Sequence, residues 1–155
     1  MSHLPEVENL VRTAVTEICE NKSDMQKCWI VFNAKSLVIQ SRVINHPTEV
    51  ADTLIELLSD QDRRVVLLSM LVLGELKDHP QTHASKAIDR INDIAWNSTD
   101  KLLGLAGGLS TALLGYDHAV QWMNNEMIKH NIPEVDRYKK NMQVMFIKEI
   151  AAGWK

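Results

Sequence analysis

Apolar side chains recur at intervals of three and four residues along most of the chain, the spacing that places them on one face of an α-helix. Pro5 and Pro47 stand where first helical residues would, since proline suits the start of a helix and not its interior. Glycine and proline otherwise fall at the edges of the periodic segments, apart from one glycine cluster at residues 104–108. The pattern predicts an all-α fold of about eight helices joined by short turns. The expected helices cover residues 5–18, 25–44, 47–58, 65–76, 84–96, 102–114, 117–128 and 133–150.

The second of these segments has a mixed pattern. A strand from Cys28 to Phe32 is conceivable there, because Trp, Ile, Val and Phe favour sheets. No partner strand is evident elsewhere, and Ser23 and Asp24 can cap a helix that begins near Met25. We therefore expect a helix, with a break near Asn33 as an alternative.

Residues 65–76 form the most unusual segment, since it is apolar nearly all round and follows a charged turn at residues 60–64. Such a helix must be covered on most sides by other helices. A similar pattern returns later: "LLSMLVLG" ends at Gly74 and "GLSTALLG" at Gly115, 41 positions further on. A period near 40 with two helices per unit is typical of HEAT or armadillo solenoids. The helices are therefore expected in antiparallel pairs.

The segment "LIELLSDQDRRVVLLSMLVLGEL" resembles a HEAT repeat. Asp60, Asp62, Val65, Leu73 and Gly74 occupy the Asp, Asp, Val, Leu and Gly positions of that family. The segment departs from the family after the valine, where an arginine is usual and valine stands here. The resemblance covers one repeat well and a second loosely. It implies an α-α superhelix that binds another protein, or less commonly nucleic acid, and a compact bundle with one HEAT-like hairpin is the alternative.

Composition narrows the class of protein. The 155 residues fit one domain, 1–155, and 45% hydrophobic with 24% charged residues is ordinary for a globular chain. The net charge of −3 gives no general attraction to nucleic acid and mildly favours a basic protein partner. The start of the chain has no apolar signal region, and the longest uncharged run, 102–116, is shorter than the roughly 20 residues that cross a bilayer. We expect a cytoplasmic protein that does not enter membranes.

Few residue groups could carry chemistry. His79 and His83 are four apart, as metal ligands on a helix would be, but Pro80 lies between them and solvated histidines are the simpler interpretation. Asp89 and Asp93 are one helical turn apart on a polar face, and no nucleophile with a base is recognisable. The sequence therefore predicts no catalytic residues, no metal site and no cofactor.

The glycine-rich segment "GLAGGLSTALLG" lacks the Gly-Lys-Ser/Thr ending of a phosphate-binding loop. Gly104, Gly107 and Gly108 are expected to let neighbouring helices approach closely, with a hinge or an anion site as alternatives. Cys19 and Cys28 are expected to be reduced thiols, with a disulfide across a helical hairpin as the alternative.

The candidate binding residues are tryptophans and arginines, which often anchor protein interfaces. Trp29 is expected in the core, beside Cys28 and Phe32. The predicted partner-binding residues are Arg63, Arg64, Trp96, Trp122 and Trp154.

These features together predict a non-catalytic module that binds another protein through a HEAT-like scaffold. Small acidic proteins of this kind include immunity proteins, the inhibitors that neutralise bacterial toxins, so a basic toxin domain is one expected partner. Two alternatives stay open. One is a helical-repeat protein that acts on nucleic acid, similar to HEAT-like DNA glycosylases. The other is a small-ligand site between helices under residues 104–108.

Overall fold

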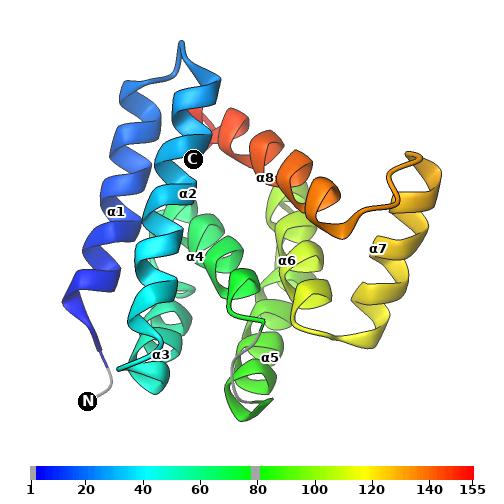
Figure 1. Cartoon of the computed structure of the whole chain (residues 1–155), viewed down its shortest axis with the longest axis horizontal. Coiled ribbons are helices and arrows are strands. Elements are labelled where there is room, and N and C mark those ends of the chain that lie inside the picture. The colour runs from blue at the N-terminus through cyan, green and yellow to red at the C-terminus, as the bar shows by residue number, and fades with distance from the viewer. Residues whose placement is uncertain (1–2, 78–80) are drawn as a thin grey trace.

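The computed structural model describes residues 3–77 and 81–155, with the side chains of 81–83 excepted. Within these ranges all regular secondary structure is helical, which confirms the all-α prediction (Figure 1). The helices are α1 (Pro5–Glu20), α2 (Met25–Arg42), α3 (Pro47–Leu57), α4 (Arg63–Glu75), α5 (Gln81–Asn97), α6 (Lys101–Leu113), α7 (Asp117–Lys129) and α8 (Val135–Ala151).

Local signals set the helix ends. Pro5 and Pro47 are the first residues of α1 and α3, as predicted. The side chain of Asp62 accepts a hydrogen bond from the backbone N–H of Arg64, and this cap starts α4 two residues earlier than predicted. Conversely, α8 begins at Val135, two residues after the proline expected to open it.

Helix α2 is continuous from Met25 to Arg42, so the strand alternative and the break near Asn33 are both wrong. Its cap is Asp24, whose side chain accepts from the N–H of Lys27. Cys28, Phe32, Ser36 and Ile39 are buried at helical spacing. A buried face with this period is what a helix supplies and a strand does not.

The first six helices pack as three consecutive pairs, α1 with α2, α3 with α4, and α5 with α6. In addition, α1, α3 and α5 pack in series, as do α2, α4 and α6, so the pairs stack in two layers. Helix α4 lies at the centre, with every residue from Val65 to Gly74 buried. The prediction that other helices cover this apolar segment is confirmed.

Helices α4 and α6 approach closely where they cross. A Cβ at Gly74 would lie 3.2 Å from Ser110 Cα, and Ser110 Oγ donates a hydrogen bond to the Met70 carbonyl at 2.6 Å. Gly74 lies inside its helix, whereas Gly115 follows α6 with φ +93°, so these two glycines of the 41-residue repeat differ in conformation. The HEAT assignment itself stays a prediction.

The last two helices separate instead of forming a fourth close pair. Helix α7 packs on α6, while α8 turns back over α1 and α2 and also contacts α6 (Figure 1). A polar clamp fixes α8 to the end of α4: Lys139 Nζ and Gln143 Nε2 donate to Glu75 at 2.9 and 2.7 Å. The return of α8 closes the stack of helices on one side.

Gly115 ends α6 in a Schellman motif, with the Tyr116 N–H donating to the Thr111 carbonyl at 2.9 Å. Because its φ is positive, Gly115→Ala is expected to lower the free energy of unfolding by about 1 kcal/mol, measured by urea denaturation. Asn131 ends α7 in the same way with φ 56°, so Asn131→Gly should leave stability unchanged or slightly raised. Equal stability of Gly115→Ala and the wild type would contradict this account.

No helix in the described part of the chain is both long and apolar enough to span a bilayer.

Candidate functional site

A groove of about 650 Å³ runs between α5 and α7, with α6 as its floor. Figure 1 shows α7 standing apart from α5, with α6 between them. Helices α1, α3 and α5 pack in series, but α7 does not pack closely on α5, and this interruption leaves the groove open. Its lining residues are Asn92, Ala95, Trp96, Gly104, Gly108, Thr111, Tyr116, His118, Ala119 and Trp122.

The floor is made of small residues on one face of α6. Gly104, Gly108 and Thr111 are separated by four and then three positions, which aligns them toward the groove. The Thr111 hydroxyl donates to the Gly107 carbonyl at 2.8 Å, so this polar group is satisfied within the helix. The floor therefore presents mainly helix backbone and small side chains.

The three clustered glycines of α6 have different neighbours. A Cβ at Gly107 would lie 2.9 Å from Ala95 Cβ, and one at Gly108 would lie 3.1 Å from the Trp122 ring, so the packing prediction is confirmed for both. At Gly104, a Cβ would meet nothing within 4 Å. A glycine inside a helix costs about 1 kcal/mol relative to alanine. Packing within the chain does not account for Gly104, so the packing prediction is wrong for this glycine, and the space beside it is open.

Two of the predicted binding residues form the walls of the groove. Trp96 is 82% exposed at the end of α5, and Trp122 of α7 lies half-buried against Gly108. The structure thus brings together two tryptophans that are 26 positions apart in the sequence. An exposed indole beside an open apolar groove is a typical anchor for a partner.

Three further lining residues, Asn92, Tyr116 and His118, were not predicted from the sequence. The rings of Tyr116 and His118 lie 5.6 Å apart at the α7 end of the groove. None of the described lining residues is Asp, Glu, Lys or Arg. The groove therefore suits an uncharged, mainly apolar group with a few hydrogen-bonding positions. The glycines of α6 were the sequence signal for its place, since a small-ligand site under residues 104–108 was one of the open alternatives; what binds there stays a prediction.

Arg63 and Trp154, two other predicted binding residues, contact each other. The Arg63 guanidinium lies 5.1 Å from the centroid of the Trp154 ring, and both side chains bind Asp100, with Trp154 Nε1 donating at 3.1 Å. Arg63 also donates to the backbone carbonyl of Lys155. Asp100 is the N-cap of α6, so this cluster fastens the chain end to the start of α6 and the start of α4.

Arg64, the remaining predicted residue, is bound to its own helix cap. Its guanidinium donates to Asp62 at 2.9 and 3.0 Å and lies 3.7 Å from Cys19 Sγ. Arg63, Arg64 and Trp154 thus have contacts within the chain, and their role toward a partner stays a prediction.

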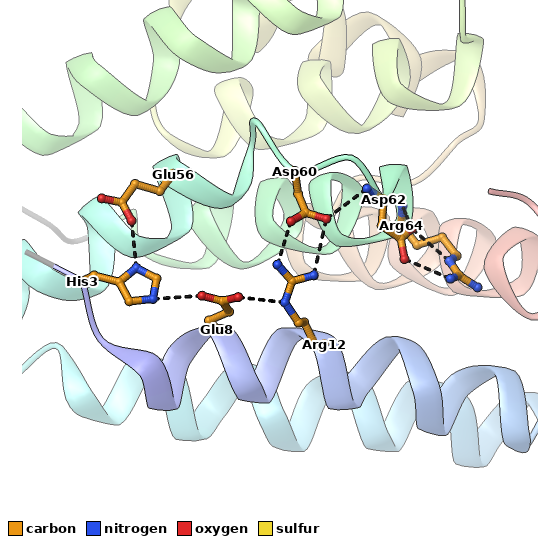
Figure 2. Close-up of polar contacts among 7 residues, drawn as sticks. All are labelled: His3, Glu8, Arg12, Glu56, Asp60, Asp62 and Arg64. Atoms are coloured by element: carbon orange, nitrogen blue, oxygen red, sulfur yellow. Dashed lines mark hydrogen bonds and ion pairs between the residues drawn. The ribbon is translucent and has the colours of Figure 1, made fainter.

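A polar network beside Arg64 holds α1 against the turn between α3 and α4 (Figure 2). Arg12 donates to Asp60 at 2.7 and 3.4 Å and to Glu8 at 2.8 Å. His3 continues the network, with Nε2 2.9 Å from Glu8 and Nδ1 2.8 Å from Glu56. The hydrogen bond from Arg12 lowers the pKa of Asp60, which in turn accepts from the backbone N–H of Asp62. Asp60 and Asp62 therefore order the turn.

The same network predicts a pH dependence. The hydrogen bond to Glu56 raises the pKa of His3, so the stability it contributes is present below about pH 6.5 and is lost as pH rises through its folded pKa. The Arg12 hydrogen bond lowers the pKa of Glu8, whose contribution is lost only as pH falls below about 4. As pH rises from about 5.5 to 8.5, the free energy of unfolding should therefore fall less for His3→Gln than for the wild type, as measured by urea titrations. Equal losses of stability in His3→Gln and the wild type would contradict a stabilising role of the His3 ion pairs.

The described residues contain no group of three or more His, Cys, Asp or Glu side chains placed to hold a metal ion. The side chains of His79 and His83 lie outside the described part. Asp93, one of the paired carboxylates, accepts from Arg90 at 3.0 Å on an exposed face of α5, in line with a solvated surface pair.

Comparison with known proteins gives no relative: no protein-family model, no curated protein sequence and no solved structure matches this chain.

Proposed function

We propose that the protein is a non-catalytic binding module and that the groove between α5 and α7 is its recognition site for another protein. The observation that carries the proposal is Gly104, which leaves an open, unfilled floor beside the exposed ring of Trp96. A charged ligand would be disfavoured, because burying an unpaired charge in an apolar groove costs several kcal/mol. The occupant is therefore an uncharged, apolar part of the partner.

The dimensions of the groove suit one face of a helix. From Gly104 to Thr111 the floor extends over eight residues of α6, and the seven steps between them cover about 10 Å at 1.5 Å per step. That length matches two turns of a partner helix, which presents apolar side chains at positions i, i+3 or i+4, and i+7. A helix in this position would continue the series in which α1, α3 and α5 pack on one another.

A small uncharged ligand is the second candidate for the same groove. Its volume of about 650 Å³ lies within the range of roughly 300–1,000 Å³ that is typical of small-molecule sites. The side chains of Asn92, Tyr116 and His118 would then supply orienting hydrogen bonds.

The narrower prediction of an immunity protein that inhibits a toxin rests on the size, acidity and composition of the chain. The nucleic-acid alternative requires a basic groove with an acidic catalytic residue. The groove described above offers neither, so it supports the protein-binding proposal more than this alternative.

The test is affinity capture of the tagged protein from a lysate of its own host, treated with nuclease, followed by mass spectrometry. The proposal predicts one stoichiometric protein partner, and a basic toxin domain would support the immunity function. Capture that disappears with nuclease would contradict the proposal in favour of nucleic acid. A copurified small molecule seen by native mass spectrometry, without a protein partner, would support the second candidate.

A further inference from the structure

Helix α2 carries an exposed apolar surface far from the groove. Among the described residues, seven large hydrophobic side chains are exposed, and four of them belong to α2 or the turn after it. Leu37 is 55% exposed and Ile44 is 83% exposed. The four are Ile30, Leu37, Val38 and Ile44.

The three of these side chains that belong to the helix lie on one side of it, and Ile44 follows its end. Ile30, Ala34, Leu37 and Ser41 follow one another at intervals of four, three and four residues, the spacing of a single helical face. Ala34 and Ser41 are exposed as well, and their small side chains would allow another helix to approach closely. We call Ile30, Ala34, Leu37, Val38 and Ile44 the α2 face.

The buried residues of α2 fall on the opposite side, toward α1, α4 and α8. The helix therefore has two apolar faces, and the core of the protein covers only one of them. A contiguous exposed apolar surface of this kind commonly marks an interaction site.

The charged residues of helix α2 are all basic. Helix α2 contains Lys27, Lys35 and Arg42 and no Asp or Glu. On the side toward α1, Lys35 and Arg42 pair with Glu17 and Glu6 and are thereby neutralised.

The two other basic residues are free to meet a partner. Lys27 is exposed three positions before Ile30, on the same side of α2 as the α2 face. Lys140 of α8 lies 4.4 Å from the centroid of the ring of Trp29, the residue next to Ile30. Among the described residues neither Lys27 nor Lys140 pairs with a carboxylate. The chain as a whole carries −3, so this surface has the opposite sign to the protein's net charge.

We propose that the α2 face binds an acidic amphipathic helix of a partner protein. Its apolar residues would pack against Ile30, Leu37 and Val38, and its carboxylates would pair with Lys27 and Lys140. Such helix-on-helix recognition uses apolar anchors at i, i+3 or i+4, and i+7, with rim charges adding specificity and association rate.

Charge argues against two other occupants. A second copy of the chain would present the same helix, which contains no Asp or Glu that could pair with Lys27. An anionic membrane would attract the lysines, but it would face a much wider part of the surface than a single helix does, and over that area the net charge of −3 opposes it.

The α2 face and the groove are separate surfaces, since α2 and α7 lie on opposite sides of the molecule (Figure 1). The proposal is therefore independent of what occupies the groove. A partner bound at each site would make the protein a bridge between two helices.

The test is a selection of random 18-residue helical peptides, displayed on phage, for binding to the immobilised full chain. Peptides that also bind the Leu37→Gln variant are removed in a counter-selection. Leu37 is more than half exposed, so this variant should unfold at the wild-type temperature. We expect peptides that are retained by the wild type and lost from Leu37→Gln. They should carry apolar residues at helical spacing and more Asp and Glu than Lys and Arg.

A synthetic peptide from that set should bind Leu37→Gln about tenfold more weakly than the wild type, and Lys27→Glu several-fold more weakly. Gly104→Leu, which alters only the groove, should bind it with unchanged affinity. No difference in selection between the wild type and Leu37→Gln would overturn the proposal, as would peptides that are neutral or basic. If the wild-type protein sediments with phosphatidylserine vesicles and the Leu37→Gln variant does not, the α2 face would be assigned to a membrane instead.

Discussion

Phe146→Ala is expected to lower the free energy of unfolding by about 3–5 kcal/mol. Phe146 is fully buried in α8, and truncation to alanine loses the transfer free energy of the ring and leaves a cavity. In a domain of this size each kcal/mol lowers the Tm by about 2–4 °C, so a fall of roughly 6–20 °C should appear in scanning calorimetry.

The matched control for this prediction is Lys148→Ala, which removes an exposed side chain from the same helix and should change the Tm little. Phe146→Ala tests whether α8, which returns across α1 and α2, belongs to the same cooperative unit as α4. A loss below about 1 kcal/mol would show that α8 is dispensable to the core.

Trp96→Ala is expected to weaken binding of the captured partner by about 30-fold or more, equivalent to about 2 kcal/mol or more. Trp96 is 82% exposed, so little of its surface is buried in the free protein and the variant should keep the wild-type stability. The affinity is measured by titration calorimetry, and the stability by urea denaturation of the same preparations.

Ile128→Ala is the control for Trp96→Ala. Ile128 is 78% exposed on α7 but does not line the groove between α5 and α7. Its truncation should leave the affinity unchanged. If both variants bind like the wild type, Trp96 is no anchor; if both weaken binding equally, the partner covers a surface beyond the groove.

The helices were predictable because each depends on local properties of the sequence. Pro5 and Pro47 mark helix starts, and the apolar spacing of α4 implied a central, covered helix, as observed. Boundaries were less accurate where a cap decides them, as at Asp62. The strand alternative in α2 arose from the sheet-favouring residues at 28–32. This helix is also apolar on two sides, which obscures its helical period.

The groove was harder to predict because it depends on how distant helices pack. Trp96 and Trp122 could be singled out by residue type. That they line the same groove depends on α7 standing away from α5, which residue type does not show. Residue type alone also cannot separate an interface anchor from an internal contact. Arg63 and Trp154 resembled anchors, and the structure shows them contacting each other and Asp100. Gly104 could be distinguished from Gly107 only by its neighbours.

The central claim, that the groove is the recognition site, is tested most directly by titrating the captured partner into Gly104→Leu and into the wild type. A leucine at 104 would fill the open floor without meeting any atom of the chain at its Cβ, and its higher helix propensity should leave the Tm equal or slightly raised. We predict an affinity about 100-fold lower for the variant, or about 2.7 kcal/mol. Equal affinity of a folded Gly104→Leu and the wild type would contradict the assignment of the groove.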